Sequence, residues 1–377
     1  MRRTTRGWPH PQLMGERWVG EDRVGQDIRF AEAGDRLRVL GDGRAGSAER
    51  TALAEYVFRP QHPTLESPRP YLDAIRTRGG ELVSLYRPHD HVWHKGISWS
   101  LPVVGDENFW GGPTFVRGQG YVQLPNNGEQ RHLAFDAIGP AGVVERLAWI
   151  TEAGETLFDE RRELRAAIVD DETWALIFAT RMRNVTDRTI PLGSPTTRGR
   201  DNAGYGGLFW RGPRSFTGGT ILAPDREGGD ELRGSRAPWL GFTGRHDGSG
   251  AWSSLVMVDD PRNVQHPPQW FARSEEFACL CPAPFFSEEH PVDPGAELIE
   301  RVAVVIADRA ADPARAATLA GHGLRLLSSV DPVDPVVADL PAEPTSPEPT
   351  SAEPTSAAPP SAEPAHVARV GREDRVP

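Results

Sequence analysis

The sequence predicts an all-β protein, an antiparallel β-sandwich or supersandwich with few helices. Three observations support this fold class. Many short runs are rich in β-branched and aromatic residues, clusters of Gly, Pro, Asn and Asp separate them, and only one segment has a convincing helical period. Strand and helix patterns do not alternate, and the sequence has no glycine-rich phosphate loop, so a Rossmann or P-loop fold is disfavoured.

The expected strands are short and either alternate polar with apolar residues or are continuously apolar. In chain order they cover residues 36–40, 81–86, 97–101, 143–150, 174–180, 253–258 and 298–306. The pairs Asp42-Gly43, Asn127-Gly128 and Asp247-Gly248 are typical of hairpin turns. The pattern over 312–329 predicts one amphipathic helix, which its glycines weaken.

Composition divides the chain into three parts. Residues 1–25 are rich in Gly, Arg and Pro, and we expect them to be poorly ordered. Residues 26–330 are expected to form a single β-sandwich domain. Residues 331–377 contain a near-repeat of Glu-Pro-Thr-Ser with little to bury, which predicts a disordered tail.

Charge and hydropathy restrict the partners. The net charge is −11, of which −6 lies in residues 331–377. The rest of the chain is therefore only mildly acidic, which argues against a surface that binds nucleic acid. No run approaches the roughly 18 apolar residues of a membrane span, and the start of the chain lacks the apolar core of a signal peptide. Cys279 and Cys281 are expected to be buried thiols in a reducing compartment. We therefore expect a cytoplasmic protein with no membrane partner; the oligomeric state stays open.

The segment 87–99 holds three of the eleven histidines, His89, His91 and His94. Imidazole is both a common metal ligand and an acid–base group near neutral pH, so a metal site and a catalytic site are both open. A third possibility is a polar loop whose histidines bind backbone groups. Lys95, the only lysine, stands where a cupin-like His-x-His motif expects a glutamate, and a cation there disfavours a metal.

Two further segments, 105–121 and 196–213, combine glycines with aromatic rings and with Arg, Asp and Asn. Flat apolar rings stack on sugar faces, while these polar groups hydrogen-bond to hydroxyls or carboxylates. The alternative is a β-corner that packs its rings in the core. The candidate substrate-binding residues are His89, Trp93, Asn108, Trp110, Tyr205, Trp210 and, as a lone histidine in a turn, His266.

The candidate catalytic residues are His91, His94, Lys95, Arg200 and Asp201. The two histidines would transfer protons, and the lysine and arginine would stabilise developing oxyanion charge. Arg200 and Asp201 could equally form a structural ion pair. We expect no cofactor; a divalent metal held by His89, His91 and His94 is the minority alternative.

The motifs at 90–97, 108–112 and 199–213 resemble those of a bacterial family of unknown function that is often labelled "methane oxygenase" (PmoA-like). The resemblance runs from about Tyr56 to about Asp308. The family's histidine motif is matched by Asp90, His91, His94 and Gly96, with Lys95 at its variable position. His89 lies outside it, and Trp93 stands where members often carry a further histidine.

What the resemblance implies is a supersandwich similar to aldose-epimerase-like (galactose-mutarotase-like) folds, with relatives associated with sugar catabolism. The leading hypothesis is a soluble carbohydrate-active enzyme, a hydrolase, lyase or epimerase, acting on a sugar or an oxidised (keto) sugar or glycoside. A non-catalytic sugar-binding protein and a metal-dependent oxygenase, as the family label says, are the alternatives.

Overall fold

The computed structural model describes residues 28–42, 50–139 and 142–329. The chain divides into two units, Met1–Val336 and Val337–Pro377, and the second lies wholly outside the described residues. The segment 1–25 and the tail 331–377 are also outside them, so their order and the domain boundaries stay predictions.

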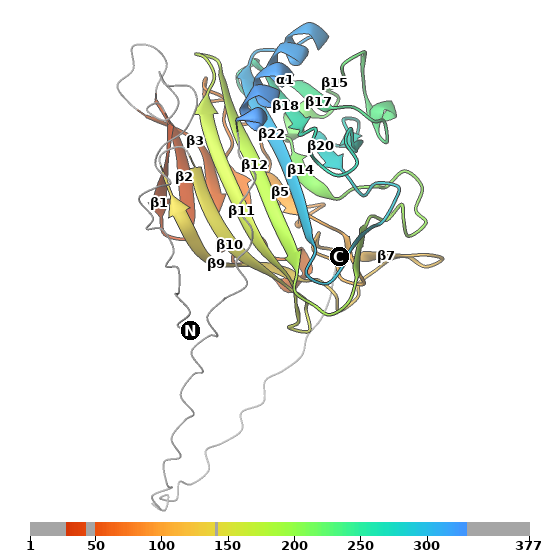
Figure 1. Cartoon of the computed structure of the whole chain (residues 1–377). Helices are drawn as coiled ribbons and strands as arrows, with labels where there is room; N and C mark the ends of the chain where they lie inside the picture. The colour runs from red at the N-terminus through yellow and green to blue at the C-terminus, as the bar shows by residue number, and fades with distance from the viewer. Residues whose placement is uncertain (1–27, 43–49, 140–141, 330–377) are drawn as a thin grey trace, which may run out of the picture. The chain divides into compact units, whose positions relative to one another are not determined.

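Two large antiparallel sheets make up the described fold, which confirms the predicted class (Figure 1). The first has nine strands in the order β16 (Glu227–Gly228), β15 (Thr220–Leu222), β17 (Trp239–Arg245), β18 (Trp252–Asp259), β22 (Glu297–Asp308), β12 (Thr173–Asn184), β11 (Thr156–Ile168), β10 (Gly142–Ile150) and β9 (Glu129–Ile138). The second has eight in the order β1 (Ile28–Ala33), β2 (Arg36–Gly41), β3 (Thr51–Val57), β4 (Tyr71–Asp73), β5 (Ile97–Ser100), β14 (Gly207–Arg211), β20 (Cys279–Ala283) and β19 (Gln269–Arg273).

Shorter elements complete the described fold. A three-stranded sheet contains β21 (His290–Val292), β13 (Ile190–Gly193) and β6 (Val103–Val104), and a hairpin contains β7 (Thr114–Val116) and β8 (Gly120–Val122). Three 3₁₀ turns are η2 (Thr64–Glu66), η3 (Arg214–Phe216) and η4 (Asp230–Leu232). No helix among the described residues is long and apolar enough to cross a membrane.

The main core lies where the two large sheets face each other. Trp99 of β5 and Phe178 of β12 come from different sheets, and their rings stack with centroids 5.8 Å apart. Both belong to one large apolar cluster that also contains Trp210 and Trp270. Burial of such side chains contributes about 2 to 3 kcal/mol each, so this interface dominates the stability of the sandwich.

The helix α1 (Pro313–Ser328) covers the outer face of the nine-stranded sheet near β18 and β22 (Figure 1). Asp312 caps it by accepting a hydrogen bond from the Arg315 amide at 2.8 Å. A Cβ on Gly323 would lie 2.9 Å from Val258 Cγ2, so this glycine, expected only to weaken the helix, permits its close approach to the sheet.

Two local predictions are wrong. Residues 81–86 are not a strand but an extended segment with isolated bridges, because its backbone pairs in other directions: the Leu85 amide donates to the Arg211 carbonyl, and the Leu85 carbonyl accepts from Gly96. Asn127-Gly128 is not a hairpin turn, since the buried Asn127 side chain donates to the Gly112 carbonyl instead. The turn at Asp247-Gly248 joins β17 to β18 as predicted, and Gly43 lies outside the described residues.

Candidate functional site

A cavity of about 610 Å³ opens beside the outer face of the eight-stranded sheet, at its β14, β20 and β19 end. Strand alternation explains the apolar layer beneath it: in β14, Trp210 points into the core between the sheets, so the neighbouring Phe209 points to the opposite face, where it packs against His94 and Trp110 of the cavity wall. The predicted site residues that line the cavity are His91, Trp93, His94, Trp110, Arg200, Asp201 and Tyr205.

His91 is half-buried in the cavity wall, and its Nδ1 lies 3.3 Å from the Asp90 carboxylate. Partial burial alone would raise the pKa of Asp90. The carboxylate's own backbone amide, His91, Arg211 and Arg214 outweigh that effect and lower the pKa to about 2. Because a permanent carboxylate faces Nδ1, we assign the proton of the neutral ring to Nδ1, which leaves Nε2 as the basic nitrogen.

His94 is buried directly behind His91, and the two rings stack with centroids 4.7 Å apart. The Arg211 guanidinium donates from Nη1 to the Nδ1 of His94 at 3.2 Å. An always-charged donor requires Nδ1 to be an acceptor, so the ring proton is on Nε2. Burial, His91 and Arg211 together lower the pKa of His94 well below its usual range. His94 is therefore a neutral hydrogen-bond donor.

Aromatic rings form the cavity walls. Trp110 contacts His94 and Tyr205, with ring centroids 5.7 and 4.7 Å away, and Phe277 contacts both histidines. Trp93 packs over Gly111 and Gly112, whose φ angles of 99° and 71° favour glycine. A Cβ on either glycine would come within 2.8 Å of Trp93 atoms.

Charged groups stand at the opening of the cavity. Arg200 donates to the Tyr121 hydroxyl and lies 4.7 Å over its ring, and the Tyr121 and Tyr205 hydroxyls are 3.0 Å apart. Asp201 is exposed on the cavity lining. Arg273, which the sequence did not single out, lines the same cavity and pairs with Asp230 and Glu276.

Asn108 supports the site from below the surface. Its Oδ1 accepts hydrogen bonds from the amides of Trp110 and Gly111 at 2.9 and 3.0 Å, and its Nδ2 donates to the Gly112 carbonyl. These bonds fix the turn that carries Trp110, so Asn108 positions the aromatic wall instead of lining this cavity.

Lys95 is placed away from the cavity. Its ammonium is buried in an ion pair with Glu66, which also binds Arg87, and it donates to the Val92 carbonyl at 2.7 Å. Burial lowers the pKa of Lys95 to about 8, against the opposing effect of Glu66. The lysine therefore fixes the histidine loop from behind and is not among the residues that line this cavity.

Three other candidates also lie outside the cavity. His89 is exposed and its Nδ1 contacts Arg214 at 3.2 Å. Trp210 is fully buried between the sheets and donates to the Val83 carbonyl. His266 pairs with Asp259 at 2.6 Å. Within the described ranges, no three His, Cys, Asp or Glu side chains are grouped to hold a metal, and His89 does not converge with His91 and His94.

The sequence model of a family of unknown function, DUF6807, matches residues 47–321. The chain belongs to this family. The description of the family gives no activity, so membership brings none to the chain and does not carry the "methane oxygenase" label. A search among curated proteins gives no significant match.

Solved structures share only distant similarity with this chain. A human-microbiome protein assigned as a kojibiose phosphorylase has a TM-score of 0.35 at 8% identity, over 81% of this chain and 37% of that one. An α-galactosidase from Geobacillus stearothermophilus in complex with raffinose has a TM-score of 0.31 at 10% identity, over 75% and 41%. The chain thus spans less than half the length of either protein.

A smaller structure, a Klebsiella pneumoniae protein assigned as an aldose 1-epimerase, has a TM-score of 0.28 at 11% identity, over 78% of this chain and 82% of that one. At these TM-scores the comparisons carry no argument about function. Any such argument rests on the geometry of the site.

Sequence reasoning missed several residues of the site: Arg211, Phe271, Arg273 and Phe277. The Arg211 guanidinium lies 3.8 Å from the centre of the Phe277 ring and reaches His94 from the other side. Side chains alternate between the two faces of a strand, so the sequence does place Phe209 and its neighbour Trp210 on opposite faces of β14, and Phe271 and Trp270 on opposite faces of β19. Both faces of these strands are apolar, however. Nothing in the sequence therefore shows which face carries the site.

Proposed function

We propose that this protein is a carbohydrate-active enzyme that abstracts a proton next to the carbonyl of an oxidised (keto) sugar or glycoside. One observation carries the proposal: an imidazole whose Nδ1 lies 3.3 Å from a carboxylate and a neutral imidazole stand side by side at an aromatic-walled cavity. Such a pair supplies one base and one hydrogen-bond donor, the two groups that enolate formation needs.

His91 is the base in this proposal. Its Nε2 takes the proton from the carbon beside the carbonyl, and the electron pair left behind moves onto the carbonyl oxygen. The Nε2 proton of His94 then hydrogen-bonds to that developing oxyanion. The negative charge of Asp90, 3.3 Å from Nδ1 of His91, would favour the tautomer protonated at Nδ1 and stabilise the imidazolium that forms.

The fate of the enolate decides the reaction class. If a glycosidic oxygen lies on the β-carbon, the enolate electrons expel it, the C–O bond breaks, and protonated His91 returns a proton to the leaving oxygen. If no such group is present, a water molecule on the opposite face would donate a proton to the carbon, the resulting hydroxide would take up the proton held by His91 through solvent, and the carbon would be epimerised. Trp93, Trp110 and Phe277 would hold the sugar by its apolar face in either case.

Exchange of the proton beside the carbonyl with solvent deuterium tests the proposal, whichever product the enzyme forms. The full chain is incubated in D₂O with mono- and disaccharides and their keto derivatives, and NMR follows loss of the proton beside the carbonyl. We expect exchange with the keto sugars, and none with the His91→Gln variant. Binding without exchange or product would instead indicate the sugar-binding alternative, and absence of both would overturn the proposal.

Two further parts of this proposal rest on sequence arguments. We propose a reducing, cytoplasmic location, supported by the two buried free cysteines, Cys279 and Cys281. We also propose catalysis without a metal or organic cofactor, since proton transfer by the paired histidines needs neither. Metal analysis of the active protein, and its turnover after chelation, test the second point.

A further inference from the structure

The proton transfer proposed above leaves the charged side chains at the opening of the cavity without a role. The lining of this cavity, which we call the histidine cavity, contains three arginines and two carboxylates: Arg200, Arg233, Arg273, Asp201 and Glu276. Positive groups therefore outnumber negative ones there, although the net charge of the whole chain is −11. A cleft whose charge is opposite to that of the chain favours an anionic ligand.

Arg200 is the member of this set whose charge no carboxylate balances among the described residues. Arg273 pairs with Asp230 at 3.3 Å and with Glu276 at 2.8 Å. Arg233 lies 3.8 Å from the same Asp230. Arg200 instead contacts the hydroxyl and the ring of a tyrosine and is exposed on the cavity lining. An exposed guanidinium without a carboxylate partner is available to an anionic ligand.

The tyrosine that Arg200 contacts begins a directional chain of hydrogen bonds. A guanidinium can only donate, so the Tyr121 oxygen accepts from Arg200. The positive charge polarises the Tyr121 hydroxyl and makes it the donor to the Tyr205 hydroxyl, whose oxygen is 3.0 Å away. Within the described ranges the Tyr205 hydroxyl has no other hydrogen-bond partner, so its own hydrogen is left for a ligand. Burial and Tyr121 raise the pKa of Tyr205, so this donor stays protonated.

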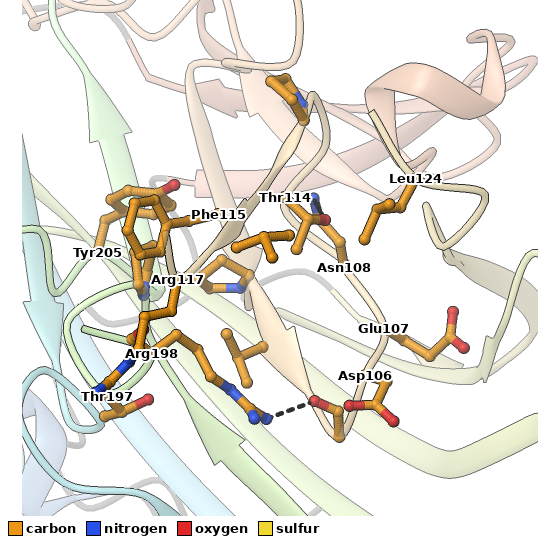
Figure 2. Close-up of a pocket in the computed structure, with 16 residues that line it drawn as sticks. Asp106, Glu107, Asn108, Thr114, Phe115, Arg117, Leu124, Thr197, Arg198 and Tyr205 are labelled. Atoms are coloured by element: carbon orange, nitrogen blue, oxygen red, sulfur yellow. Dashed lines mark hydrogen bonds between the residues drawn. The ribbon is translucent and has the colours of Figure 1, made fainter. Parts of the chain in front are cut away.

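Tyr205 lies within reach of a sugar in the histidine cavity. Its ring centroid is 4.7 Å from that of Trp110, which in turn is 5.7 Å from that of His94. A sugar that lies against Trp110 can therefore direct one end to the histidines and the other to the Tyr205 hydroxyl. Tyr205 also lines a second cavity, of about 560 Å³, where it lies beside Phe115 (Figure 2).

We propose that the histidine cavity selects sugars that carry a carboxylate, and that Arg200 and the Tyr205 hydroxyl bind this group. The inference rests on the proposed function, in which the same cavity holds the sugar. A carboxylate offers a negative charge and acceptor oxygens, whereas the hydroxyl of a neutral sugar offers only the hydrogen bond. The substrate class is then an oxidised sugar that is also an acid, a keto derivative of a uronic or aldonic acid.

The test compares glycosides that differ only in the carboxylate. Methyl β-D-glucuronide is paired with methyl β-D-glucoside, and methyl α-D-galacturonide with methyl α-D-galactoside, and calorimetry on the full chain measures their affinities. At least one acid should bind about tenfold more tightly than its neutral partner, and added salt should reduce this ratio. Tyr205→Phe and Arg200→Gln should each bring the ratio close to one.

Two more variants locate the carboxylate. Tyr121→Phe keeps the ring but breaks the chain between Arg200 and Tyr205, so it should lower the ratio, and Arg200→Gln should then cost less than it does in the wild type. Arg117→Gln removes the same charge from an exposed arginine that lines the second cavity and not the histidine cavity (Figure 2). Glutamine can still donate to the Arg198 carbonyl that Arg117 contacts, and we expect the ratio to stay within about twofold.

The outcomes separate this proposal from the proposed function. If no acid binds more tightly than its neutral partner, or if Arg117→Gln lowers the ratio as much as Arg200→Gln does, the carboxylate site is overturned. Exchange of the proton beside the carbonyl of neutral keto sugars would then still support the proposed function. A preference for acids that the Arg200 and Tyr205 variants lose, without exchange in any keto sugar, supports the carboxylate site and overturns the proposed catalysis.

Discussion

The Arg211 guanidinium donates a hydrogen bond to Nδ1 of His94 at 3.2 Å, although the two residues are 117 positions apart in the chain. The arginine is completely buried, and among the residues that the structure describes its Nε and Nη2 have no hydrogen-bond partner, although Nη2 lies 4.0 Å from Asp90 Oδ2. Burial lowers its pKa to about 10, which still leaves it charged at neutral pH. This buried charge fixes both the tautomer and the neutrality of His94.

Replacement of Arg211 by Met should therefore raise the pKa of His94, since one of the effects that lower it is gone while burial remains. The pKa of His91, which Arg211 also lowers, should rise with it. NMR titration of the ring protons measures both. The acid limb of the pH–rate profile should move to higher pH, and turnover near pH 6 should fall. Unchanged histidine pKa values would contradict the assigned role of Arg211.

Asp90→Asn should shift the acid limb of the pH–rate profile to lower pH, the opposite of the shift expected for Arg211→Met. Asp90 raises the pKa of His91 against the larger lowering effect of burial, so its neutralisation lowers that pKa further. The acid limb then moves to lower pH, while the rate on the plateau falls because the tautomer is no longer fixed. A structural role alone would lower the rate without this displacement, so the direction of the shift is the informative readout.

His91→Gln should lower turnover by roughly 10²-fold or more, the usual scale for loss of a general base. Sugar affinity should change much less, because the aromatic walls remain. His89→Ala is the matched control from the same loop, since His89 is exposed and lies outside the cavity. We expect it to retain most of the activity. Equal activity in the two variants would direct the search for the base to Asp201.

Most of the sandwich could be predicted because apolar runs such as those of β12 and β22 are bounded by turn residues and favour buried strands. The histidine loop could be found because three of the eleven histidines, His89, His91 and His94, lie within six residues of one another. The sequence could not show that Trp210 faces the core, because every residue of β14 is buried and either face could have carried the site. Nor could it pair Lys95 with Glu66, a contact made only by the fold.

His266 pairs with the buried Asp259, and this carboxyl group should make the stability of the protein depend on pH. Burial raises the pKa of Asp259 to about 6, against the lowering effect of His266 and Asn263. The folded state therefore binds this proton more tightly than the unfolded chain does. The contribution to stability is present below about pH 4 and is lost as pH rises from about 4 to 6.

The expected size of that loss is on the order of 2 to 3 kcal/mol. Asp259→Asn should flatten the dependence of the unfolding free energy on pH in this window, as measured by urea titrations from pH 4 to 7. Burial and, after it, the charge of Asp259 raise the pKa of the buried Glu300, so the substitution should also lower that pKa, while the burial of Glu300 leaves a residual slope. An unchanged slope in the variant would show that Asp259 titrates normally in the folded protein.

The position of Trp93 depends on the absence of a side chain at Gly112, and a matched pair of glycines can test this. Gly112 and Gly118 have similar left-handed φ angles of 71° and 79°. A Cβ on Gly112 would lie 2.8 Å from the Trp93 ring, whereas a Cβ on Gly118 would meet no described residue within 4 Å. Both alanine variants should lose about 1 kcal/mol of stability from backbone strain.

Only Gly112→Ala should also displace the indole and weaken sugar binding. A loss of about tenfold in affinity corresponds to the removal of one stacking ring. Tryptophan fluorescence on titration with sugar, together with the melting temperature of each variant, separates the two effects. If Gly118→Ala weakens sugar binding as much as Gly112→Ala does, backbone strain accounts for both losses and Trp93 is not a stacking ring. If only Gly112→Ala does so at equal stability, the indole that rests on this glycine contacts the sugar.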